Sequence, residues 1–201
     1  MHLQNASLAQ PNFTNARGNG TNQWKNITYA DMAHAASQGL ALQSAFSHIN
    51  TDNPDLSGFK AAGGKVISYH GLADDLIMPQ GSLNYFQRAA TAMGGVDELQ
   101  KFNRLYLIPG LGHDSSFSRS GTLDPATGAP LHANKLPLPQ NASGRDELFS
   151  ALRNWVENGA APGSINVSSA NGSVSMPLCL YPQKVSFVSG SPTQAASYRC
   201  Q

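Results

Sequence analysis

Two segments of the chain constrain its fold most strongly: residues 65–75 (KVISYHGLADD) and 103–113 (NRLYLIPGLGH). Each starts as a run of β-branched or apolar residues and ends in a turn with glycine, which is typical of a strand entering a tight loop. Asp74 and Asp75 lie in the first turn and His113 in the second. Because neighbouring parallel strands need a crossover, this spacing predicts a parallel α/β layer. Ligands bind at the carboxyl ends of such strands, where these polar residues are expected.

Three further segments have the spacing of helices. Apolar residues over about 29–49 approximate the helical period, and Thr28 is suited to cap that helix. A second helix is predicted over about 79–93, with a proline at its first position and a glycine pair after its end. A third is predicted over about 144–157. This last helix is expected to bury Leu148, Leu152, Trp155 and Val156.

The connecting segments are polar. Residues 1–28 have no period and are expected to be irregular, and residues 114–143 form a long loop rich in Ser, Gly and Pro. The resulting order, β–α–β–loop–α, is a partial α/β layer with too few strands for a complete doubly wound sheet. Unpaired strand edges would then be exposed, which predicts self-association or aggregation in the absence of a missing part of the sheet.

Composition excludes several classes of partner. A chain of 201 residues can form one domain with a hydrophobic core. Its net charge of +1 does not indicate the basic surface that binds nucleic acid or an anionic membrane. No apolar run is long enough to span a bilayer. Charged residues make up only 12%, which is common in secreted proteins. Residues 1–7 do not resemble a signal peptide, so we expect any export signal to lie upstream or to have been removed.

The two cysteines, Cys179 and Cys200, both lie near the carboxyl terminus. Neither has a second Cys or a His at metal-ligand spacing, so a zinc site is not expected. A disulfide between them would close an interval of 21 residues and stabilise a polar tail with little core of its own. This pattern favours a disulfide and an oxidising compartment, with two reduced and buried thiols as the alternative.

The turn residues suggest acid–base chemistry. A carboxylate at Asp74 or Asp75 could orient an imidazole and stabilise its charged form, or it could cap the following helix or stabilise its own turn. His113 follows a glycine-containing turn, which would display it as a general base. Because it lies 39 residues after Asp74, across one helix, the pair is a better candidate than either residue alone.

Other candidates are weaker. His70 ends the first strand and is expected to stabilise the turn more than to line a site. Ser115 and Ser116 follow His113, but no strand–elbow–helix pattern supports either as a nucleophile. The chain has no G-x-S-x-G sequence at all. The acid and the histidine therefore occur without the serine that precedes them in the Ser…Asp…His order of α/β-hydrolases.

Four segments carry a resemblance to a known family, and they keep its order and spacing. They are residues 63–74 (GGKVISYHGLAD), 104–113 (RLYLIPGLGH), 155–162 (WVENGAAP) and 177–182 (PLCLYP). From about Asp55 to its end, the chain resembles the carboxy-terminal part of the tannase/feruloyl esterase family. That family also contains enzymes that cleave mono(hydroxyethyl) terephthalate.

The resemblance implies an α/β-hydrolase fold, of which this chain would form the carboxy-terminal part, with parallel strands and flanking helices. Residues 1–50 would correspond to the end of a lid insertion and a returning helix. Residues 51–160 would form the last part of the hydrolase core, and residues 161–201 an irregular or β tail. The upstream part of the family, which carries the serine, the oxyanion hole and most of the sheet and lid, has no counterpart in these 201 residues.

The resemblance also assigns roles to residues. Asp74 corresponds to the triad acid and His113 to the triad base, whereas Asp75 falls outside the motif position. Cys179 and Cys200 correspond to a tail disulfide. Many members have a cysteine directly after the catalytic histidine, bridged to a cysteine before the serine. Here that position is Asp114, so this second bridge cannot form.

We therefore expect a secreted or periplasmic serine-type carboxylic ester hydrolase that acts on small or polymer-derived esters of aromatic acids, of galloyl, feruloyl or terephthaloyl type. This chain would supply Asp74 and His113, and the chemistry needs no metal or cofactor. The alternative is a catalytically silent fragment, or a structural or binding subunit that needs a nucleophile-bearing partner polypeptide. A third interpretation, an unrelated hydrolase that uses Ser115 or Ser116, follows if loss of both hydroxyls abolishes activity.

Overall fold

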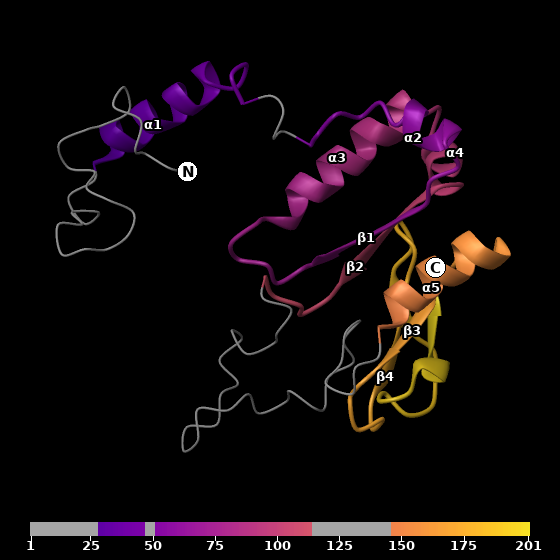
Figure 1. Ribbon diagram of the computed structural model, residues 1–201. Coiled ribbons are helices and arrows are strands. Elements are labelled where there is room, and N and C mark those ends of the chain that lie inside the picture. The colour runs from indigo at the N-terminus through magenta and orange to yellow at the C-terminus, as the bar shows by residue number, and fades with distance from the viewer. Residues whose placement is uncertain (1–27, 47–50, 114–145) are drawn as a thin grey trace. The chain divides into compact units, whose positions relative to one another are not determined.

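The computed structural model describes residues 28–46, 51–113 and 146–201 (Figure 1). It divides into two compact units, Met1–Asp52 and Asn53–Gln201. The expected irregular start and the expected loop over 114–143 lie outside the described residues. None of the described helices is long and apolar enough to cross a membrane.

The first unit contains helix α1, Tyr29–Ala41. Thr28 caps it as expected: its hydroxyl accepts from the Asp31 backbone N–H, while the Asp31 carboxylate accepts from the Thr28 N–H. The helix ends eight residues earlier than predicted, and residues 42–46 form turns. None of its residues is buried, and Phe46, which lies beyond its end, is 50% exposed. Without a buried face, little stabilises further helical turns.

The second unit begins with a parallel pair of strands and their crossover. Strands β1 (Val66–Gly71) and β2 (Asn103–Ile108) lie side by side with helix α3 (Pro79–Ala92) along them (Figure 1). Their register runs from Val66↔Asn103 to Gly71↔Ile108. The predicted crossover helix begins at Pro79, and the parallel layer is confirmed. The two five-residue helices α2 and α4 were not predicted, because such short segments show no period. The elements in order are α2 Ser57–Ala61, β1 Val66–Gly71, α3 Pro79–Ala92, α4 Val96–Gln100 and β2 Asn103–Ile108.

The two faces of β2 belong to two hydrophobic clusters, because successive side chains of a strand point to opposite sides. Leu105 and Leu107 pack with Phe86 and other residues of α3 and α4. Tyr106 and Ile108 pack instead against helix α5 (Glu147–Asn158) and the first strands of the tail. The strand pair is therefore covered on both faces, which holds its carboxyl ends in place.

Helix α5, Glu147–Asn158, covers the second face. The Asp146 carboxylate caps its start by accepting from the Phe149 N–H at 2.8 Å, and Gly159 ends it in the left-handed conformation. Leu148 and Trp155 are buried as predicted. The prediction for Val156 is wrong: this side chain is 62% exposed, because it points away from the buried stripe of the helix.

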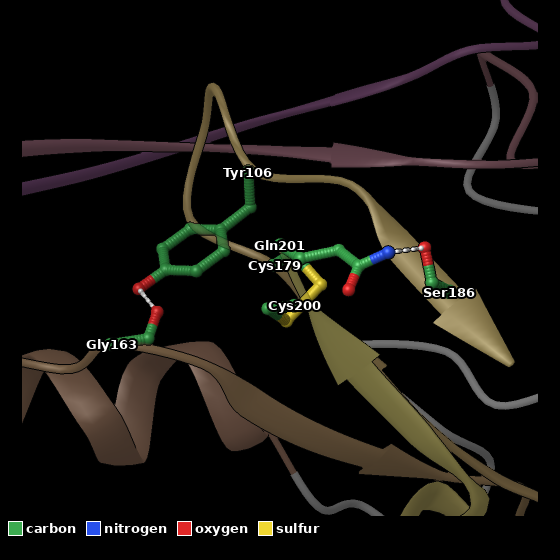
Figure 2. The surroundings of a disulfide bond; sticks show 6 residues. All are labelled: Tyr106, Gly163, Cys179, Ser186, Cys200 and Gln201. Atoms are coloured by element: carbon green, nitrogen blue, oxygen red, sulfur yellow. Dashed lines mark hydrogen bonds between the residues drawn. A yellow bond between two sulfur atoms is a disulfide. The ribbon is translucent and has the colours of Figure 1, made fainter. Parts of the chain in front are cut away.

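The tail contains two antiparallel strand pairs, and the predicted disulfide joins Cys179 to Cys200 (Figure 2). The tail is attached to β2 by the Tyr181 N–H, which donates to the Leu105 carbonyl at 2.9 Å. The Tyr106 hydroxyl donates to the Gly163 carbonyl at 3.0 Å (Figure 2). The elements are β3 Ile165–Ser168 paired with β4 Ser175–Leu178, and β5 Val185–Phe187 paired with β6 Tyr198–Cys200 after the short 3₁₀ helix η4 Ala195–Ser197.

Candidate active site

Asp74 lies in the turn between β1 and α3. Its Oδ1 accepts from the backbone N–H groups of Leu76 at 3.0 Å and Ile77 at 2.8 Å. The carboxylate therefore stabilises its own turn, which is one of the two structural roles considered for it. It does not cap α3, because the N-cap of that helix is Met78, which makes no side-chain cap bond. The side chain is only 8% exposed.

His113 follows β2 and meets the other oxygen of the same carboxylate. Its Nδ1 lies 3.1 Å from Asp74 Oδ2, and its side chain is 45% exposed. The parallel pairing explains this meeting, since Gly71 and Ile108 are register partners and the two loops leave the sheet at the same edge. The sequence-based pairing of Asp74 with His113 is thus present in the geometry.

The two loops also touch through their backbones at Gly71. The Ala73 N–H donates to the Leu111 carbonyl at 3.1 Å. A Cβ atom at Gly71 would lie 2.1 Å from that carbonyl oxygen, which is far inside van der Waals contact. Only glycine fits this close approach. A glycine in a turn is a common sequence feature, so the sequence does not reveal that Gly71 contacts the other loop.

The electrostatics of the pair set the tautomer of the histidine. Desolvation raises the pKa of Asp74, but the hydrogen bonds from Ile77, His113 and Leu76 outweigh it and lower this pKa to about 2. Asp74 is therefore ionised at neutral pH and can only accept hydrogen bonds. Nδ1 of His113 must carry the proton that it donates, so Nε2 is the basic nitrogen of the neutral ring.

His70, at the end of β1, is the third titratable residue here. Its Nε2 lies 2.9 Å from the Ile77 carbonyl oxygen and 3.4 Å from Asp74 Oδ2. Its Nδ1 lies 2.8 Å from Ser82 Oγ on α3. The expected turn-stabilising role matches these contacts. The sequence does not predict the role of Ser82, because no sequence signal marks a helix serine as the partner of a strand histidine.

Of the other sequence candidates, Asp75 follows Asp74 in the same turn and is exposed. Asp114, Ser115 and Ser116 lie outside the residues that the structure describes. Among residues 28–46, 51–113 and 146–201, no group of three or more His, Cys, Asp or Glu side chains could hold a metal ion.

An apolar cavity of about 240 Å³ lies between the two loops and the tail. Leu72 and Pro109, from the loops that carry Asp74 and His113, form part of its wall. Neither Asp74 nor His113 lines it, so the cavity neighbours the polar pair without containing it. Its other walls are Leu107, Pro177, Cys179, Tyr181, Pro182, Gln183, Lys184 and Val185.

Solved structures of similar fold are esterases. Feruloyl esterase B from Aspergillus oryzae superposes with a TM-score of 0.63 at 29% identity, over 90% of this chain and 34% of that one. Tannin acyl hydrolase from Aspergillus niger gives the same TM-score at 26% identity, over 88% of this chain and 29% of that one. These matches agree with the predicted fold, a part of a larger α/β structure.

Sequence relatives point the same way. A probable feruloyl esterase from Arthroderma benhamiae is 34% identical over 87% of this chain and 29% of its own length. Feruloyl esterase B from Aspergillus niger is 30% identical over 97% of this chain and 38% of its own length. The chain thus spans about a third of the length of the curated relatives it matches. A family model described as tannase and feruloyl esterase matches residues 5–201, and the chain belongs to this family.

Proposed function

We propose that this chain supplies the acid and the base of a serine-type carboxylic ester hydrolase. The observation that carries the proposal is the hydrogen bond between Asp74 Oδ2 and His113 Nδ1, at the common edge of two parallel strands. Family membership supports it, because the matched region includes both residues.

The proposed proton path follows from the tautomer. Nε2 of His113 takes the proton of a serine hydroxyl as the serine oxygen attacks the ester carbonyl. The ring then carries a positive charge, which the ionised Asp74 carboxylate stabilises. His113 next returns the proton to the leaving alcohol, and an acyl-enzyme remains. Water, activated by the same histidine, attacks the acyl-enzyme and releases the acid.

We place the serine and the oxyanion hole outside these 201 residues. No G-x-S-x-G sequence occurs in the chain, and the curated relatives are about three times as long. The substrates proposed are esters of aromatic acids of feruloyl, galloyl or terephthaloyl type. The names of the relatives, feruloyl esterase and tannin acyl hydrolase, support the first two types. The disulfide supports a secreted or periplasmic location, since such bonds persist in oxidising compartments.

A chimera tests the proposal. The part of Aspergillus niger feruloyl esterase B that precedes the matched region is joined to this chain, and hydrolysis of methyl ferulate is measured. We expect activity that His113→Ala lowers by roughly 10⁴-fold or more, with His34→Ala as a matched control that leaves it unchanged. Unchanged activity in the His113 variant of the folded chimera would refute the proposed role.

A second measurement distinguishes the silent-subunit alternative, which the missing serine motif favours for the chain by itself. The 201-residue chain is exposed to a fluorophosphonate serine probe, and its intact mass is measured. We expect no adduct on the chain alone and one adduct on the chimera. An adduct on the chain that maps to Ser115 or Ser116 would instead locate the nucleophile within it.

A further inference from the structure

His70 contacts three parts of the site at once. Its ring lies at the end of β1 and is 12% exposed. It reaches the Ile77 carbonyl oxygen at 2.9 Å, Ser82 Oγ at 2.8 Å, and Asp74 Oδ2 at the longer distance of 3.4 Å. The imidazole of His70, at the end of β1, therefore contacts both the turn that carries Asp74 (residues 71–77, the acid turn) and helix α3.

The chemistry of these partners determines the protonation of the ring. The Ile77 carbonyl only accepts, so Nε2 of His70 must carry a hydrogen and donate it. In the neutral ring Nδ1 then has the lone pair, and the Ser82 hydroxyl donates to it. The Ile77 carbonyl oxygen is the nearer partner of Nε2, at 2.9 Å against 3.4 Å for Asp74 Oδ2, so the contact with Asp74 is secondary.

This arrangement fixes both polar backbone groups of one turn residue. The Ile77 N–H donates to Asp74 Oδ1, while the Ile77 carbonyl accepts from His70. Leu76 and Ile77 have exposed side chains, so burial does little to hold the turn. If the His70 bond were lost, the turn could rotate and withdraw the N–H groups that orient the Asp74 carboxylate.

We propose that His70 is a positioning residue, which holds the acid turn through its Nε2–H bond to the Ile77 carbonyl so that the Asp74 carboxylate stays directed at His113. This proposal rests on the proposed function for its catalytic meaning, but its structural content is independent of ester hydrolysis. Asp74 is a charged group in contact with His70, at 3.4 Å, and His113 contacts the same carboxylate.

Two isosteric substitutions separate the two ring nitrogens. In His70→Gln, the amide N–H replaces Nε2–H and keeps the bond to Ile77. In His70→Asn, the amide reaches only the position of Nδ1, so the Ser82 contact is kept and the Ile77 contact is lost. His34→Asn, the same substitution in α1, is the matched control. Circular dichroism and thermal unfolding establish that each variant of the 201-residue chain is folded.

The first readout is the pKa of Asp74, measured from its carboxyl carbon resonance. In His70→Asn we expect it to rise by about one pH unit, the size expected for loss of one hydrogen bond to a charged group. His70→Gln and His34→Asn should leave it unchanged. The second readout is the Nδ1–H proton of His113, which should exchange faster with solvent in His70→Asn than in the other two.

The proposal is wrong if folded His70→Asn keeps the wild-type Asp74 pKa and the wild-type His113 proton, or if His70→Gln shifts them as much as His70→Asn does. The proposed function has a separate readout, hydrolysis by the chimera. If His113→Ala leaves hydrolysis intact while Asp74 responds to His70 as described, the proposed function fails and the positioning role stands.

Discussion

The site loops and the carboxy-terminal tail are held in place by different means. In the loops, residues 71–77 and 109–113, the geometry depends on hydrogen bonds from side chains and backbone, centred on the Asp74 carboxylate. In the tail, two short strand pairs are joined by the Cys179–Cys200 disulfide. The loops are therefore sensitive to the loss of single polar atoms or to a change in charge, whereas the tail is sensitive to reduction.

Burial explains why the two regions differ. The tail places Ile165, Val167 and Leu178 in a cluster with α5, but its second strand pair adds little to that cluster. A covalent link makes up for this small core. The acid turn has exposed apolar side chains and no cross-link among the described residues, so its polar bonds fix its conformation.

The largest effect is expected for Asp74→Asn. The amide oxygen can still accept from Leu76 and Ile77, so the turn should keep its shape. The amide nitrogen cannot accept from His113, which favours the wrong tautomer of that ring. We expect hydrolysis by the chimera to fall about 10⁴-fold with little change in unfolding temperature. A fall below tenfold would show that the loop bonds serve structure alone.

The disulfide should have the next largest effect. Replacing Cys179 and Cys200 with alanine removes the constraint on 21 residues, and we expect the free energy of unfolding in urea to fall by roughly 3 kcal/mol. The pKa of Asp74 should not change, because the loops do not depend on the link. A shift in that pKa would contradict the distinction between the two regions, since it would show that the tail helps to hold the acid turn.

A smaller loss of stability is expected for Gly71→Ala. The new methyl group meets the Leu111 carbonyl, and relief of this overlap should cost about 1–3 kcal/mol and displace the His113 loop. The matched control is Gly81→Ala on α3, where no atom beyond the adjacent residues and the helix's own backbone lies within 4 Å of the new Cβ. A gain of about 0.5–1 kcal/mol is expected there. Equal urea midpoints for the two variants would contradict the steric argument.

The smallest effect concerns acid. Because the folded state lowers the pKa of Asp74 to about 2, its contribution to stability is complete above the ordinary value of 3.8 and is lost as the pH falls through about 2. Unfolding in urea at pH 5 and at pH 2 should therefore differ less in Asp74→Asn than in the wild type. An identical pH dependence in both proteins would mean that the carboxylate is not held by these bonds.

The sequence predicted the strands and the crossover helix well, because buried β-branched runs and the Pro79 start are local signals. It also predicted that Asp74 and His113 would lie at one sheet edge, since this follows from parallel pairing alone. The roles of these two residues remain predictions. The end of α1 and the exposure of Val156 were predicted wrongly, because both depend on what surrounds the helix and not on its own period.

The contacts of His70 and Gly71 could not be predicted from the sequence. The hydrogen bond between His70 and Ser82 depends on how α3 is rotated about its axis. The lack of room for a Cβ at Gly71 depends on how closely the Leu111 backbone approaches β1. Neither leaves a periodic or compositional signal. His70 and Ser82 are 12 residues apart and Gly71 and Leu111 are 40 apart, so both contacts appear only when these segments are placed in three dimensions.

The close approach of Gly71 to Leu111 has a consequence for protein engineering. The acid turn and the histidine loop share a backbone surface with no room for a side chain, so they form one interlocking unit. Grafting either loop from a relative onto this scaffold should fail unless the other loop is transplanted with it. Libraries that seek new specificity should therefore exchange the two loops together and leave their contact untouched.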